Sequence, residues 1–75
     1  MISDVDIKDW ENLTEPIEID KLKVNDLFSL PNDTHVFKVD AICLNKDVIC
    51  GLLNDDVPTF VFPNFLKIVK WQKIN

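Results

Sequence analysis

The chain has 75 residues, of which 47% are hydrophobic and 28% are charged, and its net charge at pH 7 is −5. A chain of this length forms one small domain, and its apolar content is too high for a disordered protein. No apolar stretch approaches the about 20 residues that a membrane-spanning helix needs, and the first residues lack the basic and apolar regions of a signal peptide. We therefore expect a soluble, cytoplasmic protein that does not contact a membrane.

Residue usage is biased in two ways. Eight lysines and no arginine stand beside seven asparagines and eight isoleucines, a bias common in proteins from AT-rich genomes, including many phages. If a phage encodes the chain, its location is the host cytoplasm. The lack of arginine removes the side chain that usually recognises phosphate and guanine through two hydrogen bonds. Two cysteines are too few for a disulfide scaffold, so we expect free thiols.

Charge is unevenly distributed along the chain. Residues 1–20 hold seven acids and one lysine, a net charge of −6, and residues 21–56 hold six acids and four lysines, a net charge of −2. Residues 57–75 hold three lysines and no acid, a net charge of +3. This pattern predicts an acidic N-terminal lead, residues 1–20, packed on or flanking a domain formed by residues 21–75. The two ends could attract one another, each could bind a different partner, or both could simply be solvated.

The lead begins with the signals of a short helix. Ser3 and Asp6 have the spacing of a capping box with Asp in place of Glu, and we expect the helix to end near Asn12. Three apolar side chains would then share one face: Ile7, Trp10 and Leu13. The competing interpretation is an edge strand, because Val5 and Ile7 alternate with polar residues. After Pro16 a short extended segment is expected over residues 17–20.

The rest of the chain predicts five short strands. Asn25-Asp26 is a turn pair in which Asn can take the left-handed conformation. In the second strand, apolar residues from Phe37 to Cys43 alternate with polar ones, which indicates a strand with one buried face. The expected strands are 27–30, 37–43, its hairpin partner from Asp47 onward, 57–62 and 66–71, with one tight helical turn at 63–65.

The turn between the second and third strands decides which side chains are buried. Asn45-Lys46 suits a two-residue hairpin turn, which would place Ile42 opposite Ile49 and Cys43 opposite Val48. This register buries Phe37, Val39, Cys43, Val48, Cys50 and Leu52. It turns outward Ile42, Leu44, Ile49 and Leu53.

Two segments resemble parts of SH3-like small β-barrels. Leu22-Lys23-Val24-Asn25-Asp26-Leu27-Phe28 is similar to the opening of many such domains, and Phe62-Pro63-Asn64-Phe65-Leu66-Lys67-Ile68-Val69 is similar to their closing turn and strand. The resemblance covers about residues 22–71 and implies a mainly β protein, a five-strand SH3-like barrel with a short helical or extended lead. It implies no single function, because these barrels serve in RNA-polymerase factors, ribosomal proteins, chromatin readers and phage accessory proteins. The basic, glycine-containing loops of nucleic-acid-binding members are missing.

The sequence offers little for catalysis. His35 is the only histidine, and both cysteines that could pair with it are expected to face the core. Asp33 and the pair Asp55-Asp56 lack the spaced pattern of a cation-binding loop, and a single glycine excludes a glycine-rich phosphate loop. We therefore expect no catalytic residue, no metal site, no cofactor and no enzymatic activity.

Two surfaces remain as candidates for binding. The first is the apolar outer side of the hairpin, with the lead's tryptophan as an additional contact: Ile42, Leu44, Ile49, Leu53 and Trp10. An exposed isoleucine pair is unusual on a solvated strand face, although the apolar side of the lead could cover it. The second is the basic last strand, where lysines flank aromatic rings that could stack on bases: Phe65, Lys67, Lys70, Trp71 and Lys73. The lysines fall on both faces of that strand, and the net charge of −5 disfavours nucleic acid as a direct ligand.

Three functions follow from these surfaces. The first is a small non-enzymatic protein–protein interaction module, a phage-encoded or accessory modulator or inhibitor of a host protein. Its acidic lead would act as a nucleic-acid mimic towards a host nucleic-acid-processing enzyme. The second is a nucleic-acid-binding small barrel that uses the C-terminal Lys/Trp strand. The third is a self-assembling structural protein, so the chain would be a monomer or a homodimer.

Overall fold

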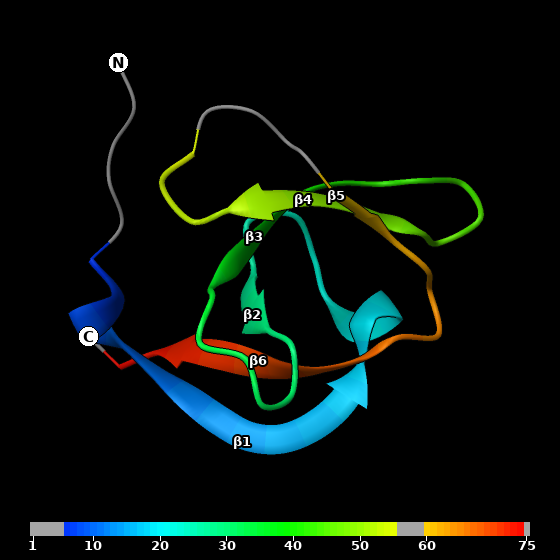
Figure 1. Cartoon of the computed structure of the whole chain (residues 1–75). Helices are drawn as coiled ribbons and strands as arrows, with labels where there is room; N and C mark the ends of the chain where they lie inside the picture. Colours follow the sequence, from blue (N-terminus) through cyan, green and yellow to red (C-terminus); the bar gives the residue numbers. More distant parts are fainter. Residues whose placement is uncertain (1–5, 56–59, 75) are drawn as a thin grey trace.

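The computed structural model describes residues 6–55 and 60–74 and shows a mainly β protein (Figure 1). Two short 3-10 turns and six strands follow one another: η1 Ile7–Asp9, β1 Trp10–Glu18, η2 Ile19–Lys21, β2 Leu27–Ser29, β3 Phe37–Ile42, β4 Val48–Leu52, β5 Phe60–Phe62 and β6 Lys67–Lys73. The strands form one antiparallel sheet in the order β1-β6-β2-β3-β4-β5, so six strands stand where five were expected. The sheet curls until β4 and β5 lie across from β1 and β6 (Figure 1), a half-barrel compatible with a small barrel fold.

The predicted helix in the lead is wrong. Its described part contains only one turn, η1, which Asp6 caps by accepting a hydrogen bond from the Lys8 N–H. From Trp10 onward the backbone is extended, and β1 pairs with β6 from Trp10 opposite Lys73 to Glu18 opposite Lys67. So short a helix is marginal by itself, whereas a strand here gains hydrogen bonds from β6 on both sides of an irregularity between Asn12 and Pro16. The start of the predicted helix, at Ser3, lies outside the described residues.

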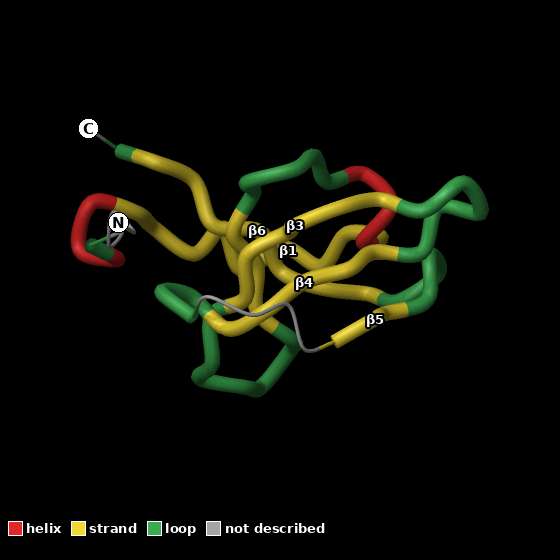
Figure 2. The backbone as a smooth tube through the Cα atoms, turned by 90° about the horizontal axis from the view of Figure 1, so that it is seen from above, coloured by secondary structure: helices red, strands yellow, loops and turns green. Residues whose placement is uncertain are grey.

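The alternative prediction, a strand in the lead, was correct about the secondary structure and wrong about its position. It was expected around Val5 and Ile7, of which Ile7 belongs to η1, while the strand begins at Trp10. The segment expected to be extended over 17–20 is divided: Ile17 and Glu18 end β1, and Ile19 begins η2. The pairing of β1 with β6 places the acidic lead beside the basic end of the chain (Figure 2), where the Ile74 N–H also donates to the Asp9 carbonyl at 2.9 Å.

The turn before β2 is as predicted. Asn25 has a φ of 76°, and the Asp26 N–H donates to the Lys23 carbonyl at 3.0 Å. The Asp26 carboxylate closes the turn from the other side by accepting the Lys23 N–H at 2.8 Å. The turn is joined to β3 because the Asn25 N–H donates to the Val39 carbonyl at 2.9 Å, and the Val39 N–H donates to the Asp26 carbonyl at 3.0 Å.

The hairpin between β3 and β4 has a longer loop than predicted. The Cys43 N–H donates to the Asp47 carbonyl at 2.8 Å, and the Lys46 N–H donates to the Cys43 carbonyl at 2.9 Å. The loop is therefore Leu44–Lys46, with Lys46 at a φ of 75°, the left-handed position that ends a three-residue hairpin loop. The predicted two-residue turn at Asn45-Lys46 is wrong by one residue.

This one-residue difference changes the predicted register. Ile42 pairs with Val48, and Ala41 pairs with Ile49. A bulge at Asp40 then restores the alternation, so that Val39 pairs with Cys50. Because directly opposed residues lie on the same side of a sheet, Ile42 belongs to the inner side with Val48, and the expected Ile42–Ile49 pair does not form.

Burial agrees with this register. Val39, Val48 and Cys50 are fully buried and Phe37 is 5% exposed, as expected, but Leu52 is only partly buried. Cys43, which was expected in the core, is half-buried next to the hairpin loop. Both cysteines are free, and burial, with a smaller contribution from the Asp40 charge, raises the pKa of Cys50 to about 12.

The core fills the inside of the curled sheet. Its buried members come from η2, the segment after it and four strands: Ile19, Leu22, Phe28, Phe37, Val39, Val48, Cys50 and Ile68. Four phenylalanines form an aromatic cluster in which the rings of Phe28 and Phe37 stack at 5.4 Å, and Phe60 and Phe62 each meet the Phe37 ring edge-on. None of the described helical segments has the length and apolarity needed to cross a membrane.

The substitution Val39→Asp tests this core. Val39 is completely buried, so an unpaired carboxylate there should remove most of the about 3–5 kcal/mol of stability typical of so small a domain. We expect the variant to be unfolded by circular dichroism at 25 °C. Val24→Asp is the matched control, because Val24 is 49% exposed and its replacement should leave the chain folded. A cooperatively folded Val39→Asp protein would contradict the core described here.

Candidate functional site

An apolar row crosses the outer side of the sheet on three neighbouring strands. Ala41 of β3 pairs with Ile49 of β4, which in turn pairs with Val61 of β5. Val61 is 63% exposed, and Leu44 is fully exposed on the loop at the end of the same hairpin. We call these four residues the outer patch. An uncharged row on an outward sheet face is the kind of surface that marks an interaction site.

The structure brings together only part of the predicted binding surface. Ile49 and Leu44 belong to the outer patch, whereas Ile42 lies on the inner side at the rim of the core and is 38% exposed. Leu53 is half-buried beyond the far end of β4, where its N–H donates to the Val36 carbonyl at 2.8 Å. Trp10 lies on β1, at the opposite edge of the sheet from β5, so the described residues of the lead do not cover the outer patch.

Val61 was missed by sequence reasoning. A strand was expected over residues 57–62, of which 60–62 are observed as β5 and 57–59 lie outside the described residues. The alternation of Phe60, Val61 and Phe62 contains the signal, because two phenylalanines directed inward turn the valine outward. Its place beside Ile49 depended on the register of two hairpins, which the sequence did not specify.

The residues of the basic last strand are dispersed. Lys67 and Lys73 lie at opposite ends of β6, and Phe65 is 71% exposed in the turn before it. The Lys70 ammonium lies 3.8 Å from the Asp26 carboxylate. The three lysines of β6 therefore form no continuous basic surface along the strand.

Trp71 has a structural role. Its indole N–H donates to the Ser29 hydroxyl at 2.8 Å, and that hydroxyl donates to the His35 carbonyl at 2.6 Å. Ser29 is 1% exposed, so this chain of hydrogen bonds joins β6, β2 and the β2–β3 loop beneath the surface. The half-buried indole is held by these contacts rather than presented as a platform for a base.

His35 is paired with an acid of its own loop. The Nδ1 atom of its ring lies 2.8 Å from an Asp33 carboxylate oxygen, and the backbone N–H of His35 donates to the same oxygen at 3.1 Å. The side-chain hydrogen bond from His35 is the main cause that lowers the pKa of Asp33. Within residues 6–55 and 60–74, no group of three or more His, Cys, Asp or Glu side chains could hold a metal ion.

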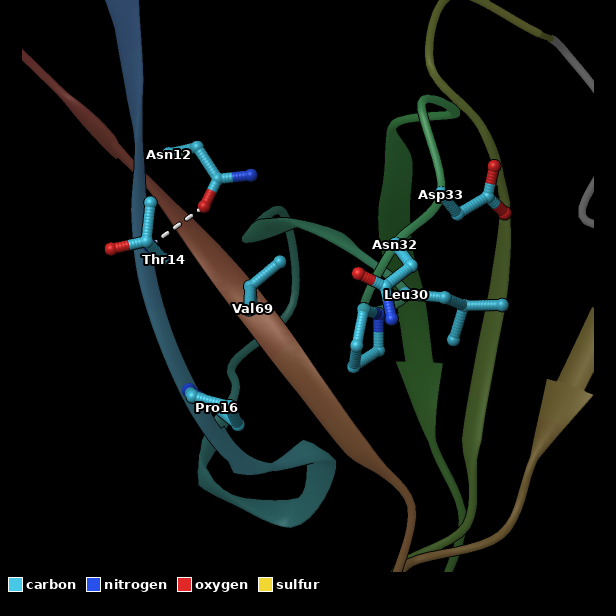
Figure 3. A pocket seen from close by; sticks show the side chains of 8 residues that line it. Asn12, Thr14, Pro16, Leu30, Asn32, Asp33 and Val69 are labelled. Carbon is cyan, nitrogen blue, oxygen red and sulfur yellow. Dashed lines mark hydrogen bonds between the residues drawn. The ribbon is translucent and has the colours of Figure 1, made fainter.

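A groove of about 450 Å³ lies between β1 and the β2–β3 loop (Figure 3). Val69 of β6 is its floor, and its lining residues are Asn12, Thr14, Pro16, Leu30, Pro31, Asn32, Asp33 and Val69. The groove arises where β1 leaves β6: Asn12 is opposite Trp71 and Pro16 is opposite Val69, so three residues of β1 stand against one of β6. The sequence did not indicate this groove, because this part of the chain was not expected to pair with the last strand.

Comparisons with known proteins give no further guidance to the site. No protein-family model, no curated protein and no solved structure matches the chain. The candidate surfaces are therefore argued from their geometry and chemistry.

The link between Trp71 and Ser29 can be tested by a double-mutant cycle. Ser29→Ala leaves the indole N–H and the His35 carbonyl without their partner, so we expect a loss of about 1–3 kcal/mol in the free energy of unfolding measured in urea. In a Trp71→Phe background the same change should destabilise less, by about 0.5–1.5 kcal/mol. Equal effects of Ser29→Ala in both backgrounds would show that the two side chains are not coupled.

The pair formed by Asp33 and His35 predicts a pH dependence. Because the folded-state pKa of Asp33 is lowered, its contribution to stability is present above the pKa of the unfolded chain and is lost as pH falls through the folded value. A carboxyl NMR titration should therefore give Asp33 a pKa below its ordinary value, and His35→Ala should raise it. A titration unchanged by that substitution would assign the shift to another cause.

Proposed function

We propose that the chain is a small non-enzymatic protein-interaction module that binds its partner through the outer patch. The observation that supports this most directly is the outward-facing apolar row of Ala41, Ile49 and Val61, in which Ala41 and Ile49 are half-buried and Val61 is 63% exposed, together with the fully exposed Leu44 at the hairpin tip. Burying such a row against a partner is favourable by roughly 25 cal/mol for each Å² of apolar surface removed from water. The described lead residues lie at the opposite edge of the sheet and leave the row open.

More specifically, we propose that the module is an accessory modulator or inhibitor of a host protein, of the kind that phages encode. Acidic side chains on β1 support it, because Glu11, Glu15 and Glu18 are all exposed. Together with the net charge of −5, they suit a partner whose contact surface is basic, such as a nucleic-acid-processing enzyme whose groove an acidic strand could occupy. The curled sheet is compatible with a small barrel fold.

Binding of nucleic acid through β6 is less well supported. Trp71 is held by Ser29, Lys70 lies beside Asp26, and the remaining lysines of the strand stand at its two ends. A sequence-independent nucleic-acid site needs several cations along one track, with aromatic faces open for stacking. Self-assembly through the outer patch remains the third alternative.

The proposal is tested by capture from a bacterial lysate, with and without nuclease treatment, using the tagged full chain and quantitative mass spectrometry. Val61→Asp places a charge at the most exposed position of the apolar row, on the edge strand β5, so we expect at least a tenfold loss of a specific bound protein. Val24→Asp is the matched control, since it makes the same change at an exposed valine in the turn before β2.

Three outcomes would contradict the proposal. Equal capture by both variants would exclude the outer patch as the site. Loss of the captured protein on nuclease treatment would favour the nucleic-acid alternative. Concentration-dependent dimerisation in sedimentation experiments, abolished by Val61→Asp and accompanied by no captured protein, would favour self-assembly.

A further inference from the structure

We propose that the groove between β1 and the β2–β3 loop binds an extended peptide segment. One peptide group would lie between the side-chain amides of Asn12 and Asn32, with an apolar side chain against Val69. This site is separate from the outer patch, and the inference holds whether or not that patch binds a protein.

The walls of the groove are formed by the backbone and exist before any ligand arrives. Thr14 has a φ of 62°, which is costly for a β-branched residue, and its N–H donates to the Asn12 side-chain oxygen at 2.7 Å. Across the groove, Asn32 has a φ of 65° in a turn that the Asp33 N–H closes by donating to the Leu30 carbonyl at 3.1 Å. A site with preformed walls loses little conformational entropy on binding.

The two amides offer complementary groups. The Asn12 oxygen is already used by the Thr14 N–H, which orients the Asn12 amide so that its NH₂ group is directed into the groove (Figure 3). The Asn32 side-chain oxygen faces the same space from the other wall (Figure 3). The Asn12 NH₂ group could therefore donate to a carbonyl of an extended peptide, and the Asn32 oxygen could accept from one of its N–H groups.

Charge and size favour a neutral ligand. No lysine lines the groove, which excludes the cationic contacts that a phosphate would need. The one acid, Asp33, directs its carboxylate away from Val69 and holds it against His35 at 2.8 Å (Figure 3). The volume of about 450 Å³ is enough for one apolar side chain and its flanking peptide groups, and Pro16 and Pro31 supply apolar walls.

The probe for this site is N-acetyl-leucine N-methylamide, which has two peptide groups and one apolar side chain. We expect titration of the ¹⁵N-labelled full chain to shift the Asn12 side-chain NH₂ signals and the Val69 backbone amide, with saturation in the millimolar range. Asn32→Gly removes one amide yet keeps a residue that accepts a positive φ, so it should weaken binding roughly two- to tenfold. Asn25→Gly makes the same change at a φ of 76° far from the groove and should have no effect.

Several results would overturn the inference. These are shifts confined to Ile49 and Val61, shifts that grow linearly without saturation, or equal weakening by the two glycine variants. A second probe, 3-methyl-1-butanol, carries the leucine side chain without peptide groups. If it bound as tightly as the capped leucine and shifted the same signals, the groove would be a hydrophobic site rather than a peptide-binding one.

Discussion

Strand β6 is the element on which the rest of the molecule depends. It is hydrogen-bonded to β1 on one side and to β2 on the other, so the first and last parts of the chain meet around it. Its side chains serve both faces: Ile68 is fully buried in the core, while Val69 forms the floor of the groove. Because these contacts join distant parts of the sequence, the loop-closure entropy must be overcome before β1 gains any stability from its pairing.

The second constraint is the set of residues in the left-handed conformation. Thr14, Asn25, Asn32, Lys46 and Asn54 all have positive φ, although the chain contains only one glycine. Asparagine tolerates this conformation and fills three of the five positions. Lys46 ends the loop that sets the register of β3 and β4, and Thr14 holds the segment of β1 that opens the groove.

The two candidate sites both belong to the outer side of the curled sheet but lie towards opposite edges. The outer patch is built on β3, β4 and β5, and the groove on β1, β6 and the β2–β3 loop. One is an apolar row with no polar group directed at a ligand, and the other is a neutral groove with two side-chain amides. A partner that used both would bury apolar surface at one end of the sheet and form directional hydrogen bonds at the other, combining affinity with specificity.

The sequence by itself determined the β class, the turn at Asn25 and the buried positions Val39, Val48 and Cys50, because alternation with a period of two and left-handed asparagines are local signals. Local signals misled at the lead, where helix-capping residues were overruled by a ladder of hydrogen bonds that only β6 can supply. They also misplaced Ile42, because a three-residue loop and a two-residue loop are both compatible with Leu44-Asn45-Lys46 and differ by one step of register. The outer patch and the groove were decided by the tertiary structure alone, since each requires strands distant in sequence to lie in one particular alignment.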